Sequence, residues 1–149
     1  MFRRALTVLI AAGGLTTSAC SGDSGTSPTI LPGAPFSTTD IRVGTGAEAT
    51  AGRRATVNYT GWMYDPILAE NKGRQFDSSL APGRQPFALT VGGGGVIRGF
   101  DQGLTGMKVG GLRRVVIPPD LAYGSTGSQD GVIPPNATLV FEIQLLEVT

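Results

Sequence analysis

The chain has 149 residues, of which 12 are basic and 11 acidic, with no histidine and a single cysteine. This length suits one domain, and the near-neutral charge argues against nucleic acid as a partner, because binding it needs clustered basic residues. Without histidine, the chain lacks the commonest zinc ligand and cannot form Ser-His-Asp or Cys-His catalytic arrangements. We therefore expect a site that uses no metal and no cofactor.

Residues 1–19 have the layout of an export signal. Arg3 and Arg4 precede an apolar stretch of eleven residues, 5–15, which is too short to span a bilayer stably. Small residues follow, and Cys20 comes directly after them. The segment resembles a bacterial lipoprotein signal, in which cleavage before the cysteine leaves that residue lipidated. The alternative is an ordinary secretory signal in which Cys20 has no role.

Residues 20–39 are rich in Gly, Ser, Thr and Pro and show no helical periodicity. Such a composition predicts a flexible tether. A tether of roughly 20 residues has a root-mean-square reach of about 25 Å. We expect residues 40–149 to form the folded domain.

Strand patterns dominate from residue 40 onward. A short strand is expected near residues 41–43. In 54–63, apolar residues alternate with polar ones, and 86–91 and 137–148 show the same alternation. The stretch 112–119 reads as a strand that Pro118 and Pro119 end.

Four glycines at 92–95 precede a segment of a different kind. Ile97, Phe100 and Leu104 recur there at helical spacing, although two glycines within the segment weaken it as a helix. The glycine run matches neither a dinucleotide-binding fingerprint nor a P-loop, so we expect it to form a turn. Together these patterns predict an α+β fold in which an antiparallel sheet carries one short helix.

Five stretches carry a family resemblance, and they occur in family order: "VNYTGW" (57–62), "FDSS" (76–79), "VIRGF" (96–100), "LAYGSTG" (121–127) and "IPPNATLVFEIQLL" (133–146). They look like the FKBP family of peptidyl-prolyl cis-trans isomerases. The resemblance implies a five- to six-stranded antiparallel sheet wrapped around the short helix, with a shallow apolar pocket between them.

The resemblance also implies which residues form the site. The catalytic residues would be Asp77, Tyr123, Ile97 and Phe100. The substrate-binding residues would be Tyr59, Phe76, Phe87, Val96, Val132, Ile133 and Phe141. Asp77 would be the carboxylate of the pocket, and Phe100 would form its floor. The backbone N–H of Ile97 and the hydroxyl of Tyr123 would be its hydrogen-bond donors. The loop that carries Val132 and Ile133 would overhang the pocket.

Ordinary structural interpretations exist for the same residues, and the chain departs from the family pattern in places. The phenylalanines could be plain core, Tyr123 a turn residue and Asp77 a surface carboxylate or a helix cap. An insertion spans 62–75, the overhanging loop lacks a histidine, and only Arg84 is a candidate partner for Asp77.

These observations predict a prolyl isomerase that accelerates proline-limited folding of exported proteins in the bacterial cell envelope. Its substrates would be proline-containing polypeptide segments, and macrolide immunosuppressants would inhibit it. A lipid on Cys20 would attach it to a membrane. We expect a monomer that is lipid-anchored in the cell envelope, on the periplasmic side of the outer membrane if the host is Gram-negative. The alternative is a secreted or soluble periplasmic protein. The alternative function is a non-catalytic module that binds proline-containing or chaperone-client segments in the same pocket.

Overall fold

The computed structural model describes residues 33–149. Its elements are β1 (Ser37–Arg42), β2 (Arg54–Tyr64), the 3-10 turn η1 (Ala69–Asn71), β3 (Lys72–Ser78), β4 (Phe87–Thr90), α1 (Arg98–Leu104), β5 (Leu112–Ile117), the 3-10 turn η2 (Pro119–Leu121) and β6 (Leu139–Val148). The expected signal segment and Cys20 lie outside the described residues.

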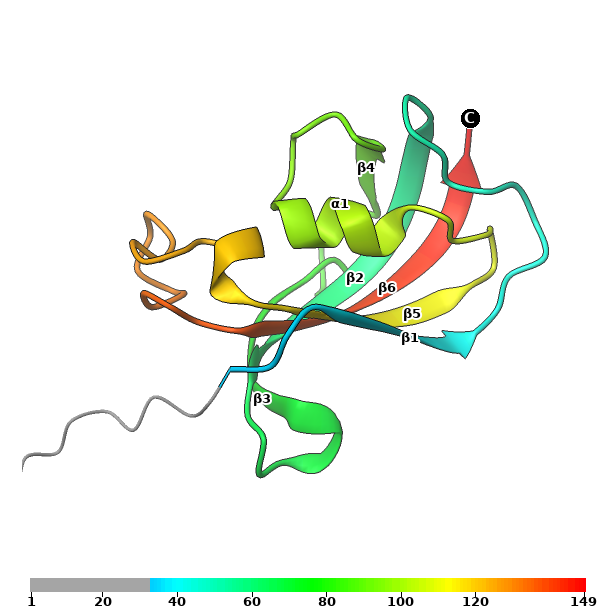
Figure 1. Cartoon of the computed structure of the whole chain (residues 1–149). Helices are drawn as coiled ribbons and strands as arrows, with labels where there is room; N and C mark the ends of the chain where they lie inside the picture. The colour runs from blue at the N-terminus through cyan, green and yellow to red at the C-terminus, as the bar shows by residue number, and fades with distance from the viewer. Residues whose placement is uncertain (1–32) are drawn as a thin grey trace, which may run out of the picture.

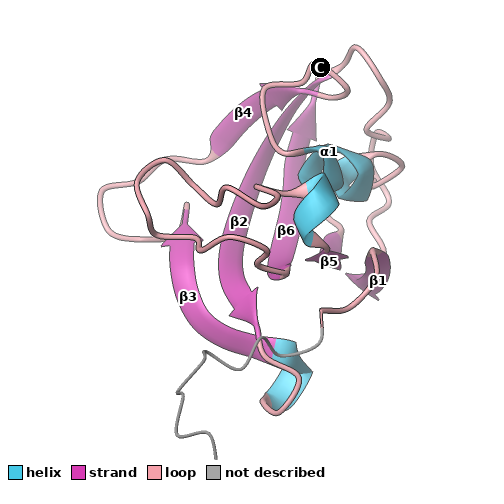
Figure 2. Cartoon of the chain, turned by 60° about the vertical axis from the view of Figure 1, so that its left-hand side comes forward, coloured by secondary structure: helices cyan, strands magenta, loops and turns pink. Residues whose placement is uncertain are grey.

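The strands form one six-stranded sheet in the order β1-β5-β6-β2-β3, and β4 also pairs with β2. Every pairing is antiparallel. β3 pairs with the C-terminal half of β2 and β4 with its N-terminal half, so both strands share one edge of β2. The sheet curves, and α1 lies across its concave face (Figures 1 and 2). This confirms the predicted fold class.

Alternating patterns located β2, β4 and β6 correctly, and β5 was located by the stretch that Pro118 and Pro119 end. β1 was expected near 41–43, but it begins at Ser37 and pairs with β5 through Thr39↔Arg114 and its neighbours. Residues 37–39, assigned to the tether, are therefore in the sheet. Their composition hid this, because every residue of β1 is exposed and a polar edge strand lacks an apolar face.

The core fills the space between the sheet and α1. Val57 of β2 lies opposite Leu145 of β6, and both side chains are fully buried, as are those of Ala55 and Ile143 on the same two strands. Each larger aliphatic side chain buried in this way stabilises the fold by about 1.5–3 kcal/mol. Leu104 anchors α1 in the same cluster.

Two glycines of α1 let the helix lie close to the sheet. A Cβ atom on Gly99 would lie 2.2 Å from Cγ2 of Ile117, and one on Gly103 would lie 2.6 Å from Cγ2 of Val115. Both separations are far below van der Waals contact. The glycines that weaken the helix by propensity are thus the residues that allow it to approach β5.

An ion-pair cluster ties the start of β3, the strand that carries two site residues, to β5 and β6. Nζ of Lys72 lies 2.7 Å from Glu70 Oε2 and 2.6 Å from Glu142 Oε1. Nη2 of Arg114 lies 2.7 Å from Glu70 Oε1, and the Lys72 ammonium also sits 4.6 Å from the centre of the Trp62 ring. The cluster joins the insertion at 62–75 to β5 and β6.

Candidate functional site

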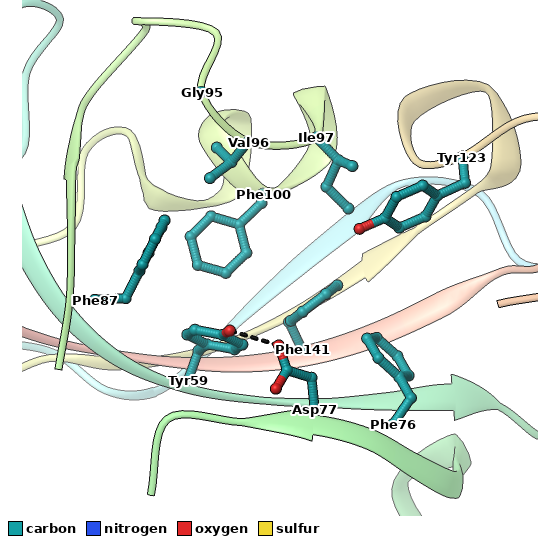
Figure 3. Close-up of a pocket in the computed structure, with 10 residues that line it drawn as sticks. All are labelled: Tyr59, Phe76, Asp77, Phe87, Gly95, Val96, Ile97, Phe100, Tyr123 and Phe141. Carbon is teal, nitrogen blue, oxygen red and sulfur yellow. Dashed lines mark hydrogen bonds between the residues drawn. The ribbon is translucent and has the colours of Figure 1, made fainter. Parts of the chain in front are cut away.

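A cavity of about 180 Å³ lies between α1 and the concave face of the sheet (Figure 3). We call it the aromatic pocket. Its lining is Tyr59, Phe76, Asp77, Phe87, Gly95, Val96, Ile97, Phe100, Tyr123 and Phe141. Residues from β2, β3, β4, β6 and α1 meet here, so the pocket depends on the whole sheet.

Interlocking aromatic rings form the base of the aromatic pocket. The Phe100 and Phe141 rings stand edge to face, with centroids 5.4 Å apart and planes at 89°. Tyr59 packs against Phe100 at 5.7 Å and 85°, and Phe76 against Phe141 at 5.5 Å and 85°. Such pairs contribute about 0.5–1.5 kcal/mol each beyond their burial. Because Phe100 is only 4% exposed, its ring is a fixed floor.

The rim of the aromatic pocket is more accessible than its floor. Phe87 and Tyr123 are 38% and 39% exposed. Figure 3 shows the Tyr123 hydroxyl pointing toward the middle of the pocket and Phe87 standing on the opposite side. Val96 and Ile97 close the side next to α1. An apolar ring of a ligand can therefore enter between two aromatic walls.

Three donors fix the single carboxylate of the aromatic pocket. The Tyr59 hydroxyl donates to Asp77 Oδ2 at 2.6 Å, and Nη2 of Arg84 donates to Oδ1 at 2.9 Å. The backbone N–H of Ser78 also donates to Oδ1 at 2.9 Å. Arg84, the candidate partner from the sequence, thus pairs with Asp77. The carboxylate is held in one orientation with its charge toward the pocket.

Both tyrosines of the pocket keep their protons at neutral pH. Burial, reinforced by the hydrogen bond to Asp77, raises the pKa of Tyr59 to about 12. Burial also raises the pKa of Tyr123, and the negative charges of Asp130 and Asp77 add to this shift. Each hydroxyl is therefore a neutral donor over the physiological range.

Two donors in the pocket have no protein acceptor among residues 33–149. One is the hydroxyl of Tyr123, and the other is the backbone N–H of Ile97. Ile97 precedes α1, and its carbonyl accepts from the N–H groups of Phe100 and Asp101. Its own N–H remains available, as does the Tyr123 hydroxyl, for acceptors on a bound chain.

The structure places two predicted site residues outside the aromatic pocket. Val132 and Ile133 both line an adjoining cavity instead, and Ile133, which is only 4% exposed, also belongs to the core. The loop folds so that Ile133 turns inward, which the linear pattern did not show. Gly95 lines the pocket but was not predicted as a site residue. The only indication in the sequence was that Gly95 directly precedes Val96. Because glycine has no side chain, its backbone forms this part of the pocket wall.

Within residues 33–149, no three His, Cys, Asp or Glu side chains gather as metal ligands. In the same part of the chain, no helix has the length and apolar character needed to cross a bilayer.

The family model of the FKBP-type peptidyl-prolyl cis-trans isomerases matches residues 46–146. The chain belongs to this family. It is 50% identical over 109 residues to an FK506-binding protein of Neisseria meningitidis serogroup A, and the match covers 73% of this chain and 92% of the relative. Its enzymatic class is therefore that of a peptidyl-prolyl cis-trans isomerase, as the resemblance predicted.

Solved structures support the same assignment. A peptidyl-prolyl cis-trans isomerase from Pseudomonas syringae superposes with a TM-score of 0.63 at 36% identity, covering 76% of this chain and 75% of that one. FkpA from Escherichia coli gives a TM-score of 0.65 at 37% identity, with 76% of this chain covered. The match spans only 48% of the FkpA chain, so the likeness concerns about half of that protein.

Proposed function

We propose that this FKBP-type isomerase acts in the aromatic pocket on proline-containing segments of exported proteins, and that a lipid on Cys20 holds it in the bacterial cell envelope. One observation carries the site assignment: the rigid aromatic floor lies beside a fixed carboxylate and two unengaged donors. The export-type residues at the start of the chain support the location.

The reaction suits such a site because it moves no proton. Partial double-bond character gives the peptide bond a rotation barrier of about 18–20 kcal/mol. The twisted transition state loses this resonance and is less polar than either planar form, so an apolar pocket binds it better than the ground state. Lowering the barrier by about 5 kcal/mol would accelerate the reaction by 10³ to 10⁴.

Each residue has a separate task in the proposed mechanism. The proline ring sits over Phe100 between the aromatic walls, which positions the bond to be rotated. The Tyr123 hydroxyl and the Ile97 N–H donate to carbonyl oxygens next to the proline. Asp77 supplies a fixed negative field and an acceptor. Turnover of a panel of short X-Pro peptides by the full-length protein tests this assignment.

We expect kcat/KM for an X-Pro peptide to vary little between about pH 6 and 9. Carboxyl groups ordinarily titrate near pH 4 and tyrosines near pH 10, and the pKa of Tyr59 is raised further to about 12. The raised pKa of Tyr59 should also make stability fall above this range. The unfolded tyrosine loses its proton near pH 10 and the folded one near pH 12, so stability is lost as pH rises through that window.

The variant Asp77→Asn separates a fixed field from proton transfer. Under the proposed mechanism, a folded Asp77→Asn enzyme is less active but has the same flat profile. A bell-shaped wild-type profile with a limb near neutrality, absent in Asp77→Asn, would instead make Asp77 a general acid or base.

We further propose that the pocket binds FK506 and related macrolides. The relatives from Neisseria meningitidis bear the name FK506-binding protein, and they share about half of the aligned residues with this chain. The pocket offers such a ligand the exposed faces of Phe87 and Tyr123.

Replacing the lipidation candidate should release the protein from membranes. We expect full-length Cys20→Ala to move from the detergent phase to the aqueous phase, because multiple acyl chains anchor a protein firmly. Ser21 follows the cysteine, which for a Gram-negative host favours the outer membrane. Mass spectrometry and phase partitioning check this. Equal partitioning of wild type and Cys20→Ala, with the wild-type mass unmodified, would rule out the anchor.

A further inference from the structure

A second cavity, of about 300 Å³, adjoins the aromatic pocket and has a different character. We call it the polar annex. It shares Phe76, Asp77 and Tyr123 with the aromatic pocket, so these three residues stand between two neighbouring cavities. The rest of the annex comes from the Arg84 loop and from the loop around Asp130.

The charges in the polar annex do not cancel. Two carboxylates, Asp77 and Asp130, face one guanidinium, that of Arg84. Arg84 pairs with Asp77 at 2.9 Å, and no cationic side chain within residues 33–149 forms an ion pair with Asp130. Oδ1 of Asp130 accepts from the Ser128 hydroxyl and from the Val132 N–H. Among the described residues, no donor reaches Oδ2.

The loop that carries Asp130 is firmly held. The Ser128 N–H donates to the Ile133 carbonyl and the Ile133 N–H donates to Ser128 Oγ, both at 2.9 Å. Nη2 of Arg74, on β3, donates to the Val132 carbonyl at 3.0 Å. Since Ile133 is also anchored in the core, the Asp130 carboxylate is presented at a fixed place on the rim of the annex.

We propose that the polar annex receives the side chain of a substrate residue next to the proline, and that Asp130 makes the enzyme favour a basic residue there over an acidic one. The inference rests on the proposed function, which seats the proline over Phe100. Consecutive Cα atoms are only about 3.8 Å apart, so a neighbour of that proline lies within reach of the residues that the two cavities share. A cationic side chain then meets the free oxygen of Asp130.

The expected preference is modest because the contact is exposed to solvent. Ion pairs of this kind change an equilibrium by about two- to fivefold. They also weaken with salt, because the screening length falls from about 30 Å at 0.01 M to about 3 Å at 1 M. The preference should therefore shrink toward unity at high ionic strength.

The test compares full-length wild type, Asp130→Asn and Asp120→Asn on peptides with Lys or Glu directly before or directly after proline. Asparagine retains an acceptor for Ser128 and Val132, so the loop should keep its shape. Asp120 is exposed and lines neither cavity, so Asp120→Asn controls for loss of one negative charge nearby.

At one of the two positions, we expect the Lys-to-Glu ratio of kcat/KM to be about two- to fivefold lower in Asp130→Asn than in wild type. Asp120→Asn should keep the wild-type ratio, and Asp130→Lys should shift it further toward Glu. Equal ratios in wild type and Asp130→Asn, or an equal change in Asp120→Asn, would overturn the inference. A wild type that turns over none of the peptides would instead refute the proposed function on which the inference rests.

Discussion

Phe100→Ala is expected to lower kcat/KM for an X-Pro peptide by tenfold or more, which corresponds to about 1.4 kcal/mol of transition-state stabilisation. The variant removes the floor of the aromatic pocket, where the ring packs edge to face on Tyr59 and Phe141. Because Phe100 is almost fully buried, the free energy of unfolding should also fall, by about 3–5 kcal/mol. Kinetic assays on the variant and its denaturant unfolding check the two effects separately.

Leu104→Ala provides the matched control. Leu104 lies on the same helix, is fully buried and does not line the pocket. Its truncation should cost about 2–5 kcal/mol of stability and leave kcat/KM near the wild-type value while the protein is folded. If folded Phe100→Ala kept full activity, or if Leu104→Ala lost as much activity, the floor would not be the reacting site.

Gly99→Ala should destabilise the domain, although alanine is the better helix former by about 1 kcal/mol. The added Cβ would lie 2.2 Å from Cγ2 of the fully buried Ile117, so α1 and β5 must separate. Overpacking of this kind costs about 1–3 kcal/mol, and each kcal/mol lowers Tm by about 4 °C for a domain of this size. Thermal unfolding of wild type and variant measures the shift.

Gly95→Ala is the control for this prediction. A Cβ on Gly95 meets no atom within 4 Å, and its φ is outside the left-handed region. We expect its Tm to stay close to that of wild type. A Gly99→Ala variant at least as stable as wild type would show that the helix does not pack on β5 as closely as described.

How far the fold could be predicted depended on whether a segment repeats an apolar pattern. β2 and β6 bury alternate side chains, and their alternation located them. β3 contains a single large apolar side chain, Phe76, among polar residues and a glycine. Its strand form comes from pairing with β2 rather than from local preference, so periodicity could not identify it.

The site could be predicted only where it rests on short motifs. The resemblance supplied nine of the ten residues that line the aromatic pocket, all but Gly95. It could not supply the hydrogen bond from Tyr59 to Asp77, because the β2–β3 register, with Gly61↔Asp77, brings these distant residues together. The inward turn of Ile133 likewise depends on the Ser128 and Arg74 contacts, which are long-range or specific to this loop.

The central claim is that isomerisation takes place in the aromatic pocket. The most direct measurement is exchange NMR of one X-Pro peptide with the full-length protein, first alone and then with saturating FK506. We expect substoichiometric amounts of the protein to produce cis/trans exchange peaks of the peptide, and the chemical-shift changes that the peptide induces to concentrate on Tyr59, Phe100 and Tyr123. Saturating FK506 should remove both effects. Exchange that persists at the same rate while FK506 occupies the pocket would contradict the central claim.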